Sequence, residues 1–109
     1  MALARARVSM PDTAQPGEII TVKTLIRHPM ETGYRLDSRG RSIPRHIITR
    51  LTAVYAGTEV FRMDFTQGVA ANPFVAFTLR AQETGDLVCT WEDDLGETTT
   101  VTKTLTVDP

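Results

Sequence analysis

The side chains that could act as a nucleophile, a base or a metal ligand are few: one cysteine, Cys89, and two histidines, His28 and His46. A reactive thiol needs partial exposure and a neighbour that stabilises the thiolate. Cys89 instead lies at alternate positions with Leu87 and Trp91, which predicts a small buried side chain in a strand. A single cysteine also excludes a disulfide within the chain.

His28 and His46 flank a long irregular segment and could meet in space. With Glu31 or Asp37 they could form a metal site or an acid–base pair, but their spacing matches no known metal motif. A hydrogen-bonded structural role is therefore favoured. There is no glycine-rich phosphate loop and no serine elbow. The sequence predicts no catalytic residue, no metal and no cofactor. The alternative left open is a small thiol- or metal-dependent enzyme that uses Cys89, His28 and His46.

The segment that runs between the histidines is rich in arginine. Six arginines fall within residues 27–50, where only Glu31 and Asp37 oppose them. Such a local excess of positive charge can steer an anionic partner, and arginine, methionine and tyrosine are enriched at protein interfaces. The segment is therefore predicted to be ordered and to bind a partner, the alternative being an ordinary solvated loop. The predicted partner-binding residues are Arg27, His28, Met30, Glu31, Tyr34, Arg35, Arg39, Arg41 and Arg45.

The chain has 109 residues, which predicts a single domain over residues 1–109. Its formal net charge is -1, whereas domains that bind nucleic acid through charge are normally basic. No apolar run is long enough to span a membrane, and the N-terminal residues lack the unbroken apolar stretch of a secretory signal. Composition thus indicates neither nucleic acid nor membrane as a partner. It suggests a cytoplasmic protein or one exported by other means.

Apolar residues recur at every second position in most of the chain, which is the period of β-strands. Seven such segments separated by turn signals are typical of an immunoglobulin-like antiparallel β-sandwich. The expected strands are residues 5–10, 18–27, 47–55, 59–65, 74–80, 87–91 and 97–107. The residues expected to form the core are Ile20, Val22, Ile26, Leu51, Phe61, Phe77, Leu79, Cys89 and Trp91.

Four segments of the chain resemble the SoxZ family: IRHPMETGYR at 26–35, IPRHII at 43–48, ANPF at 71–74 and WEDDLG at 91–96. The likeness extends over essentially the whole chain, and the first segment is long and unusual in composition. SoxZ proteins are the small subunits of the SoxYZ carrier complex of bacterial thiosulfate oxidation. The resemblance implies an immunoglobulin-like sandwich, in agreement with the periodicity, and a non-catalytic role.

The resemblance further implies a heterodimer with SoxY, whose flexible C-terminal segment ends near a cysteine that carries the sulfur intermediates covalently. Transient contacts with the pathway enzymes are expected as well. The complex works in the periplasm, and a subunit without its own signal peptide would be exported together with SoxY. This chain ends in LTVDP and has its cysteine in mid-strand, so it matches the scaffold subunit rather than the carrier.

Two further expectations concern the isolated chain. A sheet edge left open in the absence of SoxY is prone to pair with itself, so a homodimer is expected to be accessible. A small sandwich that shields a partner in the manner of a chaperone is the remaining alternative.

Overall fold

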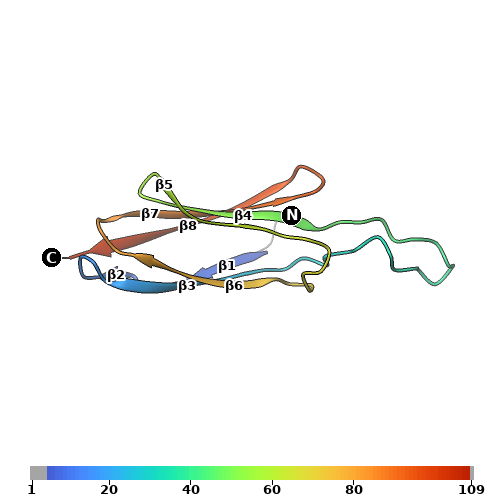
Figure 1. Cartoon of the computed structure of the whole chain (residues 1–109), viewed down its shortest axis with the longest axis horizontal. Helices are drawn as coiled ribbons and strands as arrows, with labels where there is room; N and C mark the ends of the chain where they lie inside the picture. Colours follow the sequence, from blue (N-terminus) through green and yellow to red (C-terminus); the bar gives the residue numbers. More distant parts are fainter. Residues whose placement is uncertain (1–4, 109) are drawn as a thin grey trace.

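The computed structural model describes residues 5–108, which form two β-sheets packed face to face (Figure 1). The described residues contain no helix long and apolar enough to cross a membrane. The strands are β1 (Ala6–Ser9), β2 (Thr13–Ala14), β3 (Ile19–Ile26), β4 (Ile48–Tyr55), β5 (Thr58–Asp64), β6 (Phe74–Arg80), β7 (Gly85–Asp93) and β8 (Thr98–Val107).

One sheet has three strands in the order β1-β3-β6, and the other has five in the order β2-β8-β7-β4-β5. This arrangement confirms the predicted sandwich. Neighbouring strands are antiparallel, except that the two residues of β2 pair in parallel with Thr106 and Val107 of β8. The sequence placed only a turn between Pro11 and Gly17. The chain crosses there from one sheet to the other, and it pairs briefly with β8 on the way.

The core lies between the two sheets and is built from alternate residues of the long strands. In β3 every second residue from Ile20 to Ile26 is buried, and in β7 the buried row runs from Leu87 through Cys89 and Trp91 to Asp93. The predicted core residues are all buried except Phe61. Phe61 packs against the core but is only half-buried, because β5 is the edge strand of its sheet.

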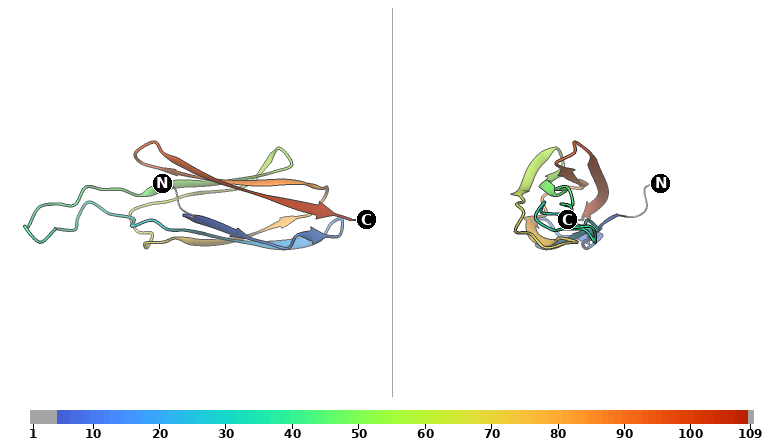
Figure 2. Two further views of the ribbon diagram at one scale, coloured as in Figure 1. Left: turned by 180° about the vertical axis from the view of Figure 1, so that it is seen from behind. Right: turned by 90° about the vertical axis from the view of Figure 1, so that its right-hand side faces the viewer.

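The connection from β3 to β4 extends well beyond the sandwich, as Figures 1 and 2 show. The molecule measures 61 × 27 × 19 Å along its principal axes as a result. Residues 31–46 form this extension, which is called the projecting hairpin below. Glu31 pairs with His46 at its root, where it leaves the sandwich.

Trp91 offers the clearest test of the core, because its large side chain is 1% exposed. Trp91→Ala should lower the free energy of unfolding by ~3–5 kcal/mol through lost packing and a residual cavity. The measurement is urea denaturation followed by circular dichroism. Leu95→Ala is the matched control, because Leu95 is 65% exposed in the β7–β8 turn and its truncation should change stability by less than ~0.5 kcal/mol. Equal losses in the two variants would contradict the proposed core.

Candidate functional site at the root of the projecting hairpin

Backbone hydrogen bonds hold the projecting hairpin in a defined shape. Glu31 and His46 exchange two hydrogen bonds of 2.8 Å, Ile43 donates to the carbonyl of Arg35, and Asp37 donates to that of Arg41. The segment therefore pairs part of its own backbone N–H and C=O groups, as an ordered element must.

The tip of the hairpin is organised by one carboxylate. Asp37 Oδ1 accepts from the backbone N–H groups of Arg39 at 2.8 Å and Arg41 at 3.0 Å. Gly40 has φ of 78°, a conformation that glycine adopts without strain and that other residues resist. The same turn brings Gly40 N–H to the carbonyl of Asp37.

The charge of the hairpin is lower than its arginine content suggests. Four of the six arginines between residues 27 and 50 are paired with carboxylates: Arg35 with Glu31, Arg41 with Asp37, Arg45 with Asp94 and Arg50 with Asp64. Two of these carboxylates, Asp94 and Asp64, come from distant parts of the chain. Arg27 and Arg39 make no ion pair within the described residues, so these two carry the positive charge that remains available.

The structure separates the predicted partner-binding residues into two groups. Tyr34, Arg35, Arg39, Arg41 and Arg45 are exposed on the projecting hairpin, and Arg27 is exposed beside its root. His28 and Met30 are buried, at 2% and 4% exposure, and Glu31 is half-buried. The buried pair cannot touch a partner directly, so any role they have in binding is to hold the root in place.

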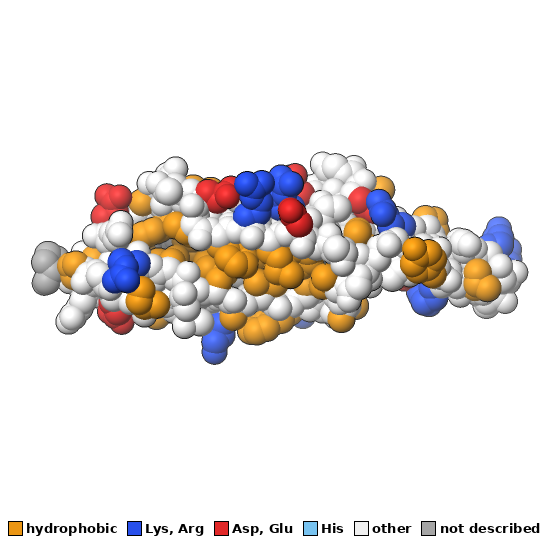
Figure 3. Space-filling view, viewed as in Figure 1, with side chains coloured by type: hydrophobic (Ala, Val, Ile, Leu, Met, Phe, Trp, Pro, Cys, Tyr) orange, Lys and Arg blue, Asp and Glu red, His pale blue; other side chains and the backbone are white. Residues whose placement is uncertain are grey.

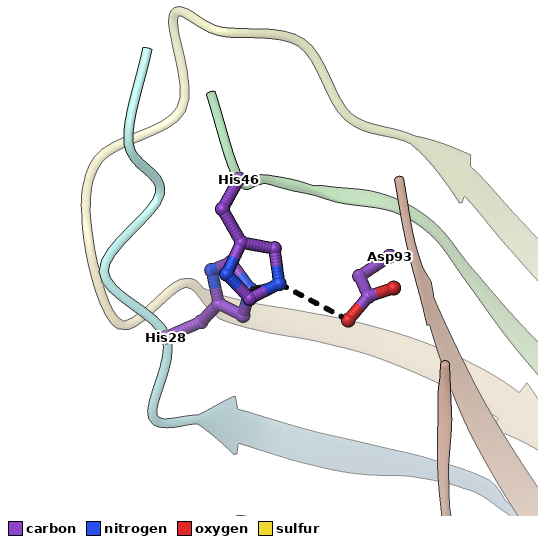
Figure 4. Close-up of side chains that lie close together, drawn as sticks. All are labelled: His28, His46 and Asp93. Atoms are coloured by element: carbon purple, nitrogen blue, oxygen red, sulfur yellow. Dashed lines mark hydrogen bonds and ion pairs between the residues drawn. The ribbon is translucent and has the colours of Figure 1, made fainter. Parts of the chain in front are cut away.

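His28, His46 and Asp93 converge at this root from three separate segments (Figure 4). His28 Nε2 lies 3.3 Å from His46 Nε2, which in turn lies 3.2 Å from Asp93 Oδ2. The two imidazole rings meet edge to face, with centroids 4.4 Å apart. The expected meeting of the two histidines thus occurs, but their acidic neighbour is Asp93 and not Glu31 or Asp37.

The hydrogen bonds determine where the ring proton of His28 resides. Met30 N–H donates to His28 Nδ1 at 3.0 Å, so this nitrogen bears no proton. A neutral imidazole carries one N–H, which must then be on Nε2 and faces His46. His46 Nε2 can make one hydrogen bond in the plane of its ring. It either accepts the N–H of His28 Nε2 or carries a proton itself and donates it to Asp93.

Asp93 links the root to the turn between β7 and β8. Its Oδ1 accepts from the N–H groups of Leu95 and Glu97, both at 2.9 Å, and so shapes the β7–β8 turn. Burial acts to raise the pKa of Asp93, but the N–H of Glu97, the ring of His46 and the N–H of Leu95 together hold that pKa below its ordinary value. Sequence reasoning missed Asp93 although a signal was present. It continues the inward-facing alternation of Leu87, Cys89 and Trp91, where a carboxylate is unusual.

Three potential ligand atoms of His28, His46 and Asp93 lie within 4.8 Å of one another, which is close enough to surround a metal ion. A metal bound through His28 Nε2 requires the ring proton on Nδ1, and a ligating histidine normally donates that proton to an acceptor. Here Nδ1 faces a donor, Met30 N–H, instead. The arrangement therefore fits a hydrogen-bonded link better than a metal site.

Burial lowers the pKa of His28 below its ordinary value of 6.5, and the charges of His46 and Arg5 lower it further, against the raising effect of Asp93 and Asp94. The unfolded chain then binds the proton more readily than the folded one. The stability that this difference in the pKa of His28 contributes to the folded state is complete above pH 6.5, and it is lost as pH falls through the pKa of His28 in the folded chain. We expect the free energy of unfolding to decrease between pH 7.5 and pH 5.5, and this decrease to shrink in His28→Gln.

The control for that experiment is His46→Gln, which removes the half-exposed imidazole and retains His28. It should keep most of the decrease, because burial, the largest cause of the lowered pKa of His28, remains and only the smaller effect of His46 is lost. A decrease of unchanged size in His28→Gln would show that another group is responsible.

Cys89 is not part of this cluster, and no charged neighbour among the described residues shifts the pKa of its thiol. Its side chain is fully buried, and burial raises the pKa of its thiol from 9.0 to about 11. The thiol-dependent alternative, which required Cys89 to act with the two histidines, therefore gains no support from the structure.

The raised pKa reduces the thiolate fraction at pH 8 by a factor of ~100 relative to an ordinary cysteine, and burial blocks the reagent as well. We expect iodoacetamide to modify Cys89 slowly in the folded protein and rapidly in 8 M urea, as followed by intact mass. Cys89→Ser verifies that no other residue is modified. Equal rates in the two solutions would show that the thiol is accessible in the folded state.

Comparison with known proteins gives two kinds of similarity. The family model described as sulphur oxidation protein SoxZ matches residues 7–104. No curated protein matches the chain by sequence.

Among solved structures, superoxide reductase (neelaredoxin) from Ignicoccus hospitalis has a TM-score of 0.74 at 20% identity, covering 94% of this chain and 80% of its own. The sulfur carrier protein SoxY from Chlorobium limicola f thiosulfatophilum has a TM-score of 0.69 at 14% identity, covering 98% and 82%. Such low identities show a shared fold alone. The family model, in contrast, spans nearly the whole chain, and the protein therefore belongs to the SoxZ family of sulfur-oxidation proteins.

Proposed function

We propose that this chain is the non-catalytic subunit of a periplasmic SoxYZ carrier complex. It binds SoxY, which carries the sulfur intermediates on a cysteine, and helps to present them to the enzymes of thiosulfate oxidation. The match of the SoxZ family model to residues 7–104 carries this proposal.

The chemistry of Cys89 supports a division of labour between two subunits. A cysteine that carries sulfur must be exposed and must reach the thiolate state, whereas Cys89 is buried with a raised pKa. The carried group must therefore reside on a partner. The Chlorobium limicola sulfur carrier protein SoxY shares the fold of this chain, so the complex would join two sandwiches of similar architecture.

The projecting hairpin is the element best placed to meet a pathway enzyme or SoxY beyond the body of the sandwich. Its exposed residues include Tyr34, at 78%, and Leu36, at 58%. Aromatic residues and arginines contribute strongly to interfaces. With most of its arginines paired, the hairpin would recognise a partner at short range, and Arg39 would supply the main attraction at longer range.

The test is association of this chain with SoxY from the same organism, and of the resulting complex with each pathway enzyme, at two salt concentrations. We expect a stable complex with SoxY. Substituting Arg35, Arg39 and Arg41 together by serine should slow at least one association at low salt, because rim charges act mainly on the association rate. The control is Arg62→Ser with Lys103→Ser, which removes two exposed cations of the five-stranded sheet.

Two results would count against these statements. Failure of the unsubstituted chain to bind SoxY would contradict the proposed function. Unchanged association rates of the triple variant in every pairing would leave the complex in place and remove the projecting hairpin from its contact surfaces.

A further inference from the structure

The two outer faces of the sandwich differ in charge. Strands β1, β3 and β6 contain three cationic residues, Arg7, Lys23 and Arg80, and no aspartate or glutamate. All three cations are exposed. Strands of the five-stranded sheet contain five acidic residues, of which Asp93 is buried, and three basic residues. The three-stranded sheet thus presents a basic face, and the other sheet a face that is acidic on balance.

The basic face also exposes apolar side chains. Phe74 is 62% exposed and lies directly across from Leu25, which is 38% exposed, and Ile19 on the same face is 52% exposed. Single exposed apolar residues are common on protein surfaces. Here Phe74 and Leu25 are neighbours on a face that also carries Arg7 and Arg80, and aromatic residues and arginines are enriched at protein interfaces.

The edge of this face formed by β6 lacks the features that usually block strand pairing. Exposed edges are normally protected by being short, charged or bulged. Strand β1 has four residues, and β5 carries Glu59, Arg62 and Asp64 and borders a bulge at Ala53 and Val54. Strand β2 pairs with only two residues of β8, whose remaining edge carries one charge, Lys103. By comparison β6, FVAFTLR, has seven residues in unbroken register with β3 and no charge before Arg80.

The hydrogen-bond pattern shows which backbone groups of β6 remain available. Ala81 donates to the carbonyl of Glu18, and Ile26 donates to that of Pro73. Hydrogen-bonded pairs alternate along an antiparallel ladder, so Val75, Phe77 and Leu79 direct their backbone groups to β3. The backbone groups of Phe74, Ala76, Thr78 and Arg80 then point outward from the edge.

The side of the molecule next to this edge is apolar. Figure 3 shows a continuous band of hydrophobic side chains along the seam between the two sheets, with charged side chains above it. The seam is where edge strands β5 and β6 face each other, and the rings of Phe61 and Phe77 stack across it at 4.4 Å. Val60 and Phe74 add exposed apolar surface on either side.

We propose that the β6 edge, with the adjoining basic face, is the surface on which SoxY docks. SoxY would add a β-strand to β6 and present carboxylates to Lys23 and Arg80, while Phe74 is covered by apolar side chains. This inference rests on the proposed function and names the surface that serves it. Strand addition supplies affinity through main-chain hydrogen bonds and specificity through alternate side chains. Strands β1, β3 and β6 of a second copy would bring cations and no carboxylate to this face, apart from Glu18 in the turn before β3.

The experiment measures the dissociation constant of SoxY from the same organism for four variants of the full chain. Phe74→Ala removes the aromatic side chain, and Ala76→Pro removes an outward N–H without touching the β3–β6 ladder. We expect each to weaken binding at least tenfold while thermal unfolding stays close to that of the unsubstituted chain. The matched controls are Leu95→Ala, an exposed leucine elsewhere, and Arg62→Pro, which removes an outward N–H from the β5 edge. Both controls should bind SoxY as the unsubstituted chain does.

A charge reversal and the oligomeric state of the free chain complete the test. Lys23→Glu with Arg80→Glu should also weaken binding, and the loss should diminish at high salt because like charges then repel less. Binding by Phe74→Ala and Ala76→Pro that stays within twofold of the unsubstituted chain would overturn the proposed surface and leave the proposed function intact. If those variants instead abolish a homodimer and leave SoxY binding unchanged, the edge pairs with a second copy and the proposal is wrong. Failure of the unsubstituted chain to bind SoxY would refute the proposed function itself.

Discussion

The two sheets differ in width, yet each must cover the apolar inner face of the other. The rest of the structure depends on this constraint. Five strands lie over three, and the chain closes one side by crossing between the sheets at β2. The other side, between β5 and β6, has no such crossing strand. Three inward-facing residues on that side, Phe61, Met63 and Val75, are consequently only partly buried, although Phe77 and Leu79 of β6 are buried. The path of the chain through β2 therefore explains why one side of the sandwich is closed, whereas the side between β5 and β6 is open.

The long strands were predictable because half-buried strands impose a period of two on the sequence, from Ile20 to Ile26 as clearly as from Leu87 to Trp91. The features that the sequence did not predict depend on tertiary contacts. The pairing of β2 with β8 involves only two residues, too few to leave a pattern. Phe61 occupies an inward-facing alternate position, but its strand lies at the edge of the sheet, so it is only half-buried. The ion pairs of Arg45 and Arg50 join residues far apart in sequence, so local charge counting overstated the positive potential of residues 27–50.

The candidate site was predictable only in part for a similar reason. The two histidines flank the projecting hairpin, and their meeting could be anticipated from that position. Asp93 comes from the far end of β7, and only the assembled sandwich brings it to the root. The family likewise emerged from specific segments of sequence, whereas the fold is shared by superoxide reductases and a sulfur carrier. Architecture alone therefore says little about chemistry.

The geometry of the projecting hairpin has a consequence for how such proteins can diverge. Its two arms leave the sandwich beside one bridge, Glu31 with His46. Within the described residues they also contact the sandwich next to that bridge, where Gln67 donates to the carbonyl of Thr32 and Arg45 pairs with Asp94. Residues can then be added or removed as facing pairs without moving the root. The length of the hairpin can thus change at its tip while the root and the core stay unchanged.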